Sequence, residues 1–148
     1  MPQLSVQAQG ARAKGGTITS ARRVIVVLAA IVERGGRLLV TRRLTGTHLA
    51  GLWEFPGGKC EPGETHEACL ARELKEELGV GSTIGDEILA TEHDYADRTV
   101  RLRFRRCAID DDPRPMLGQE IRWVTRAELS SLEFPPADAE LIEMLRSE

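Results

Sequence analysis

The structure of this chain is expected to depend on residues 58–80, which read GKCEPGETHEACLARELKEELGV. Glycine and proline crowd into the first part of this stretch, which predicts a loop. The second part predicts a helix, with Thr65 as its N-terminal cap and Gly79 at its C-terminal end, where glycine is preferred. Helical spacing gives this helix an apolar stripe that can pack on a core, formed by Ala71, Leu74 and Leu78.

Three carboxylates share one face of the predicted helix. Glu73, Glu76 and Glu77 stand at positions i, i+3 and i+4, and Glu64 in the preceding loop can reach the same end. Like charges this close repel one another, so a positive charge is expected among them. Oxygen ligands in this arrangement suit Mg²⁺ or Mn²⁺. The alternative is a solvated acidic face, which the helical segment alone would favour because Glu is a good helix former.

The spacing of this stretch resembles the Nudix box. Gly58 is followed after five residues by Glu64, and after seven more by residues 72–80, which read RELKEELGV. Every position that the Nudix box specifies is matched. The resemblance implies a Nudix hydrolase, an enzyme that uses divalent cations to cleave a nucleoside diphosphate linked to another group. It also implies an α/β/α sandwich with a mixed β-sheet.

Further segments resemble one subgroup of that family, the MutT-like nucleoside triphosphate pyrophosphohydrolases. They extend the likeness over roughly residues 22–148 and occur in the same order: residues 41–43 (TRR), 52–59 (LWEFPGGK), 97–98 (DR) and 134–137 (FPPA). Enzymes of this subgroup release a nucleoside monophosphate and pyrophosphate. Their best-known role is to destroy 8-oxo-dGTP before it is used in DNA synthesis, so the resemblance implies a part in nucleotide pool sanitation and DNA repair.

Carried over residue by residue, the resemblance gives each candidate site residue a role. Metal ligands would be Glu73, Glu76, Glu77 and the Gly57 carbonyl, with Arg72 orienting a neighbouring carboxylate; Arg43 and Lys59 would meet phosphate oxygens; Phe55, Arg98 and Asp138 would contact the base.

A carboxylate would take the proton of the attacking water, and Glu76 and Glu120 are both candidates. Many relatives carry a Glu six residues before a late-strand Trp. Here that position is Leu117, and Glu120 lies three residues before Trp123.

Asp138 bears on the choice of substrate. MutT proteins specific for oxidised guanine carry Asn at this position, whereas relatives that hydrolyse cytidine triphosphates carry Asp. A carboxylate can accept hydrogen bonds from an exocyclic amine, or donate one when protonated, so both bases are compatible. We expect 8-oxo-dGTP first and (d)CTP or a modified cytidine triphosphate second. Asp138 could instead be only a helix N-cap.

Two other classes of function are weighed against this one. Another Nudix activity, on nucleotide sugars, dinucleoside polyphosphates or RNA 5′ caps, would usually show extra signatures after the box, and none is recognisable. A non-catalytic binding module would typically lose the box carboxylates, which this chain keeps.

Composition indicates a single globular domain over residues 21–148. The chain has 148 residues, 41% hydrophobic and 29% charged, and a net charge of −3, which argues against stable nucleic-acid binding. No apolar run is long enough for a signal peptide or membrane span.

The three cysteines, Cys60, Cys69 and Cys107, lack a paired spacing and are predicted to be free thiols in a reducing compartment, the cytoplasm. We expect a monomer or homodimer that binds a small nucleotide.

Periodicity predicts an α/β or α+β architecture with a mixed sheet. Apolar runs and alternation predict strands at residues 24–32, 37–41, 53–55, 88–95, 99–109 and 120–124, with a short helix at 126–132 and a C-terminal helix after Pro135-Pro136. Gly35-Gly36 and residues 96–98 are the predicted hairpin turns.

Residues 1–20 are predicted to be a disordered tail, because they carry little apolar surface to bury. Deleting them should leave the melting temperature and the activity nearly unchanged. Calorimetry and an activity assay on the shortened chain check this; a loss of many degrees would show that the tail is docked.

Overall fold

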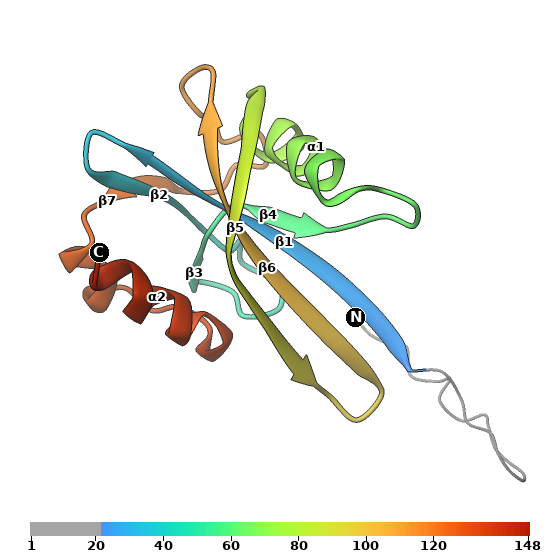
Figure 1. Ribbon diagram of the computed structural model, residues 1–148. Helices are drawn as coiled ribbons and strands as arrows, with labels where there is room; N and C mark the ends of the chain where they lie inside the picture. Colours follow the sequence, from blue (N-terminus) through green and yellow to red (C-terminus); the bar gives the residue numbers. More distant parts are fainter. Residues whose placement is uncertain (1–21) are drawn as a thin grey trace, which may run out of the picture.

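The computed structural model describes residues 22–148 (Figure 1). The predicted tail at residues 1–20 therefore lies outside the described residues. The elements run in the order β1 (Arg23–Arg34), β2 (Arg37–Arg42), β3 (Trp53–Glu54), β4 (Gly57–Lys59), α1 (His66–Leu78), β5 (Ser82–Asp94), β6 (Arg98–Ile109), β7 (Ile121–Val124), two 3₁₀ turns (Ala127–Ser131 and Pro136–Asp138) and α2 (Ala139–Arg146).

Strand β1 is the axis of a mixed sheet. One edge of it pairs in parallel with β6 from Arg23 to Val32, and β6 pairs antiparallel with β5. The other edge pairs antiparallel with β4 at Val27–Ala29 and with β2 at the strand's end. Strands β3 and β7 then extend the sheet beyond β2. A strand that is paired on both edges and covered on both faces must be apolar throughout, which explains the uninterrupted run in the sequence.

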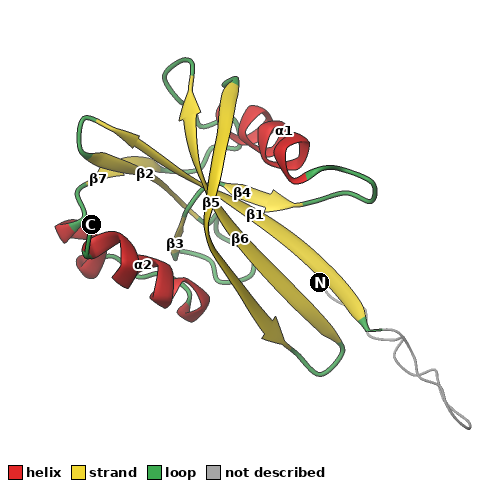
Figure 2. Ribbon diagram, in the orientation of Figure 1, coloured by secondary structure: helices red, strands yellow, loops and turns green. Residues whose placement is uncertain are grey.

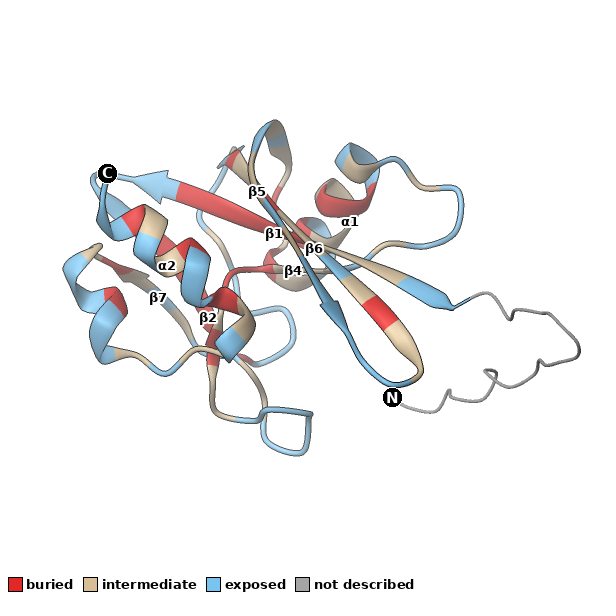
Figure 3. Ribbon diagram, turned by 60° about the horizontal axis from the view of Figure 1, so that its bottom comes forward, coloured by how far each residue is buried: buried red, intermediate tan, exposed pale blue. Residues whose placement is uncertain are grey.

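The two helices lie on opposite sides of the sheet (Figures 1 and 2). Helix α1 packs Leu70, Leu74 and Leu78 against one set of core residues, and α2 packs Leu141 and Leu145 against another. Successive residues of β1 alternate between these two cores, as the period of a strand requires. Buried segments accordingly run along the middle of the sheet and the inward faces of the helices (Figure 3). The predicted layered fold with a mixed sheet is confirmed.

Most of the predicted local signals are confirmed. The side chain of Thr65 caps α1 by accepting from the Ala68 amide at 3.1 Å, and Gly79 ends the helix in the left-handed conformation with φ 68°. Gly35 and Gly36 both adopt positive φ, 59° and 77°, as a tight hairpin turn requires. The predicted short helix at 126–132 is a 3₁₀ turn.

Two strands differ from the prediction. Strand β5 begins at Ser82 rather than at residue 88, because register shifts around Glu87 absorb the Gly85-Asp86 segment without ending the strand. Strand β4 was predicted as part of a loop. It pairs so closely with β1 that a Cβ at Gly57 would lie 1.9 Å from the Leu28 carbonyl oxygen, so only glycine fits there.

Within residues 22–148, none of the helices combines the length and apolar character needed to cross a bilayer.

Candidate active site

A cleft of about 410 Å³ opens between the middle of β1 and the segments on its β2 side. Its walls bring together four predicted site residues, Arg43, Phe55, Gly57 and Lys59, with Glu77 of α1. Leu117 and the buried Gln119, which precede β7, form part of the same wall. Residues as far apart in the sequence as Val27 and Gln119 thus face one cavity, because β1 and β2 hold β4, α1 and β7 around it.

The guanidinium group of Arg72 joins the loop before α1 to the carboxylates on the helix. Its Nε and Nη2 donate to the two oxygens of Glu64, at 2.6 and 2.9 Å. Nη1 lies 3.2 Å from a Glu73 oxygen and 3.4 Å from Glu76, and Nη2 also donates to the Lys59 carbonyl. This two-pronged hydrogen bonding holds the pKa of Glu64 at about 2. Arg72 therefore fixes the position of β4 relative to the acidic face of α1.

The carboxylates of Glu73 and Glu77 are packed against β4. A Cβ at Gly58 would lie 2.4 Å from the carboxyl carbon of Glu73, so this glycine lets the strand backbone reach the helix. The Gly57 amide lies 3.4 Å from a Glu77 oxygen. Burial, and then the charges of Glu73 and Glu54, raise the pKa of Glu77 to about 8.

The donor set fits a hard divalent cation. Glu73 and Glu77 present carboxylate oxygens beside the Gly57 backbone, while the side chain of Glu76 is 57% exposed one turn away. The raised pKa of Glu77 means that this site favours added positive charge. Oxygen ligands of this kind suit Mg²⁺ or Mn²⁺ better than softer metals.

Basic groups line the cleft beside this acidic helix. Arg43 donates to the Glu54 carboxylate at 2.9 Å and to the His48 carbonyl at 2.5 Å, while Lys59 is exposed at the cleft's edge. Burial raises the pKa of Glu54, and the Arg43 charge opposes that rise. In the sequence Glu54 belongs to a predicted strand and to the LWEFPGGK segment, but no site role is predicted for it.

The apolar end of the cleft is formed by Phe55, whose ring stacks on Phe134 with centroids 5.4 Å apart. Asp138 is buried, and burial, followed by the charge of Glu54, raises its pKa to about 7. Asp138 occupies the N-cap position of α2, but its side chain makes no capping hydrogen bond to that helix. A carboxyl group buried without that structural use is a candidate for ligand recognition.

Arg98 lies farther along the sheet. It pairs with Arg23 in the strand register, donates to Asp97 at 3.0 Å and covers the Tyr95 ring at the tip of the β5–β6 hairpin. It is not part of the cleft wall. Its predicted contact with the base therefore remains a prediction.

Glu120 and Gln119, the two residues that precede β7, lie in different environments. The Glu120 carboxylate lies 3.4 Å from Arg42 and 3.3 Å from Arg122, on the protein surface. Gln119 instead donates to the Glu77 carbonyl at 2.9 Å and lines the cleft. Glu120 as a general base remains a prediction, while Gln119, which the sequence did not single out, supports the end of α1.

The prediction of three free thiols is wrong. Cys60 and Cys69 form a disulfide, and only Cys107 is a free, buried thiol. The loop before α1 folds back over the helix and brings the two Cα atoms to 5.2 Å, within bridging distance, which the spacing alone did not reveal. Such a short closed loop typically stabilises the fold by about 2–3 kcal/mol.

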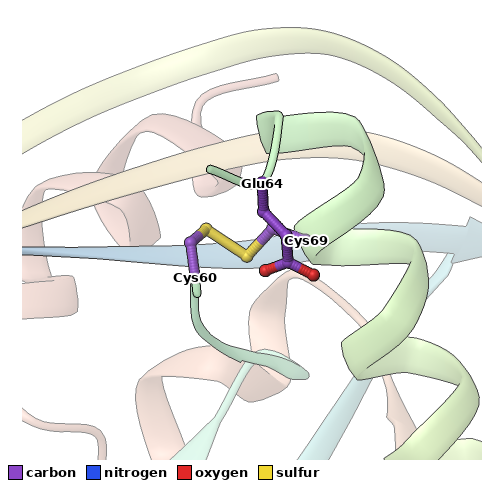
Figure 4. A group of neighbouring side chains, drawn as sticks. All are labelled: Cys60, Glu64 and Cys69. Atoms are coloured by element: carbon purple, nitrogen blue, oxygen red, sulfur yellow. A yellow bond between two sulfur atoms is a disulfide. The ribbon is translucent and has the colours of Figure 1, made fainter. Parts of the chain in front are cut away.

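Glu64 lies beside the two sulfur atoms (Figure 4). These residue types can bind metals. Sulfur in a disulfide is not a thiolate ligand, however, and both Glu64 oxygens already accept from Arg72. In the oxidised state this group is a covalent link between loop and helix rather than a metal site.

Comparison with known proteins agrees with this geometry. The sequence profile of the NUDIX domain matches residues 27–144. A putative 8-oxo-dGTP diphosphatase 2 of Mycobacterium tuberculosis is 40% identical, over 76% of this chain and 82% of its own. The CTP pyrophosphohydrolase of Escherichia coli is 35% identical, over 82% and 90%. A solution structure of MutT from methicillin-resistant Staphylococcus aureus superimposes with a TM-score of 0.72 at 33% identity, covering 86% and 98%.

The chain belongs to the Nudix hydrolase family. Within that family it is MutT-like.

Glu77→Gln should stabilise the metal-free protein while lowering its activity by orders of magnitude. The Glu77 carboxyl has a folded pKa of about 8 against an ordinary 4.5, so its ionisation costs stability progressively as pH rises between these values. In the presence of a chelator, the variant should melt above the wild type by about 5 °C or more at pH 9, with the difference closing near pH 4.5. Thermal unfolding across pH measures this.

Glu76→Gln is the matched control, because that side chain is exposed on the same helix and should change the melting temperature little. Near-wild-type turnover in Glu77→Gln would contradict its placement in the metal site.

Proposed function

We propose that this protein is a divalent-metal-dependent nucleoside triphosphate pyrophosphohydrolase that acts first on 8-oxo-dGTP, releasing the nucleoside monophosphate and pyrophosphate. One observation carries the proposal. A single cleft is lined by the carboxylate-bearing Glu77 of α1, by the basic Arg43 and Lys59, and by the aromatic Phe55. The charged residues suit a polyphosphate with its cation, and the aromatic ring suits a base.

Basic and acidic residues have separate roles in this proposal. Arg43 and Lys59 bind phosphate oxygens, while Glu73, Glu76 and Glu77 hold Mg²⁺ or Mn²⁺. A divalent cation there supplies positive charge that stabilises the charge developing during phosphoryl transfer. The three carboxylates are fixed relative to the phosphates by the β4 backbone and Arg72.

Proton removal from the attacking water falls to a carboxylate, Glu76 or Glu120, which contributes a typical factor of ~10²–10⁴. Its shared helix face with Glu73 and Glu77 supports Glu76, which lies 3.4 Å from Arg72. Glu120 would first have to leave Arg42 and Arg122.

Glu54 and Asp138 are suited to reading the base. Burial raises the pKa of both groups, and the charge of Glu54 adds to the rise at Asp138. A carboxylate accepts from ring N–H and amine groups, and a protonated carboxyl also donates. 8-Oxoguanine offers both amine and N–H donors on its edges. Cytosine offers an exocyclic amine, so cytidine triphosphates are the second candidate, favoured by Asp138 and by the likeness to a CTP pyrophosphohydrolase.

We propose that the enzyme works in the cytoplasm on the free nucleotide pool, as a monomer or homodimer, without stable binding to nucleic acid. The net charge of −3 supports the last point, because nucleic-acid-binding domains are usually basic.

A nucleotide panel tests the proposed function. The protein should hydrolyse 8-oxo-dGTP with the highest kcat/KM and (d)CTP analogues next, and release pyrophosphate rather than phosphate. Activity should vanish with a chelator and return with Mg²⁺ or Mn²⁺. Preferential cleavage of nucleotide sugars or dinucleoside polyphosphates would assign another Nudix activity instead.

Asp138→Ala should reduce the differences in kcat/KM between triphosphates that carry different bases. The carboxyl group needs a donor opposite it, and dTTP has a carbonyl at that position. Loss of the interaction should therefore lower kcat/KM for the preferred base ~10- to 100-fold and leave dTTP nearly unchanged. Steady-state kinetics on both triphosphates measure this. Glu140→Ala, an exposed change two residues later, is the control. An equal fall for all triphosphates would show that the base is read elsewhere.

A further inference from the structure

The disulfide lies directly beside the proposed phosphate-binding residue. Cys60 is the residue after Lys59, at the end of β4, and Cys69 lies on α1, fully buried against its core. The bond therefore ties the strand that carries Gly57 and Lys59 to the helix that carries the carboxylates (Figure 4).

The two cysteines differ in access. Cys60 is half-buried and lines an open surface cavity of about 760 Å³, together with Lys59, Glu64 and Arg72. Cys69 has no exposed surface. An external thiolate can approach the sulfur of Cys60 from this cavity, whereas Cys69 is protected by the protein.

We propose that Cys60–Cys69 is a reversible thiol–disulfide site that tunes nucleotide binding, an inference that rests on the proposed function of Lys59. In reduction, a thiolate of a dithiol reductant bonds to the sulfur of Cys60. The disulfide breaks, and its electron pair passes to Cys69, which takes a proton. The reductant's second thiol then displaces Cys60 as a thiol and closes the reductant's own disulfide.

The reverse reaction uses a peroxide as the two-electron oxidant. The Cys60 thiolate attacks one peroxide oxygen and forms a sulfenic acid, releasing water after protonation. The thiol of Cys69 then displaces a second water and re-forms the disulfide. Two thiols and one hydrogen peroxide thus give one disulfide and two waters.

Reduction would loosen the loop without releasing it. The Cys60 amide still donates to the Val26 carbonyl at 2.9 Å, and Arg72 still holds the Lys59 carbonyl at 3.1 Å and the Glu64 carboxylate. These bonds keep the fold intact. What is lost is the covalent restraint next to Lys59, so that ordering its side chain and loop on the phosphates costs more. The oxidised enzyme is therefore the tighter-binding form.

The experiment compares the full-length protein after treatment with dithiothreitol and after treatment with hydrogen peroxide, each followed by removal of the reagent. Alkylation under denaturing conditions should count three thiols in the reduced sample and one in the oxidised sample. KM for the preferred triphosphate should rise ~2- to 10-fold on reduction with a smaller change in kcat. Hydrogen exchange should speed up in residues 59–64.

Two variants serve as references. Cys60→Ser cannot form the disulfide, so after either treatment it should show the higher KM expected of the reduced wild-type protein. Cys107→Ala removes the buried free thiol and should respond to redox treatment like the wild type.

Resistance of the native disulfide to dithiothreitol, or equal KM and exchange in the two states, would overturn the proposal and leave the bond as a fixed structural link. Thiol count and hydrogen exchange need no substrate. If no triphosphate is cleaved in either state, it is the proposed function that fails, and these two measurements still decide whether the site is redox-responsive.

Discussion

The site depends on a single guanidinium group. Arg72 reaches two oxygens of Glu64, the Lys59 carbonyl and the nearer carboxylates of its own helix. Without that positive charge, the acidic face of α1 would repel both itself and the loop that precedes it. The same contacts fix the strand that carries the glycines. The same contacts therefore position both the proposed metal ligands and the proposed phosphate-binding segment.

Close backbone approach supplies the second constraint. Gly57 lets β4 lie against β1, and Gly58 lets it lie against Glu73. A side chain at Gly57 would push β4 away from β1, and one at Gly58 would push β4 away from the Glu73 carboxylate. The carboxylates of Glu73 and Glu77 are thus held at the edge of the sheet, in surroundings that raise the pKa of Glu77. Crowded, buried carboxylates of this kind favour a cation, which supports the proposed metal site.

Sequence patterns predicted the features that depend on the conformational preferences of only one or two residues, such as helix ends and turns. The cap at Thr65, the stop at Gly79 and the Gly35-Gly36 turn each follow from a preference of one or two residues. The layered fold followed from apolar periodicity and from the family resemblance. The bulged start of β5 was missed because register shifts depend on the neighbouring strand.

The remaining parts of the site depend on tertiary contacts. β4 is a strand only because β1 offers its edge, and a Gly-rich segment carries no strand signal of its own. Gln119 and Glu54 acquire their roles from neighbours far away in the sequence, at Glu77 and Arg43. Likewise, the Cys60–Cys69 bond depends on how the loop folds back over α1.

The parallel pairing of β1 with β6 has a consequence for the order in which the chain can fold during synthesis. Arg23 pairs with Arg98, 75 residues later, whereas the opposite edge of β1 finds β2 and β4 much sooner. At ~5–20 residues per second, one edge of the most apolar strand waits about 4–15 s for its partner. An unpaired apolar edge is a template for association with other chains. During synthesis this edge of β1 therefore stays open to such association until β6 has been made.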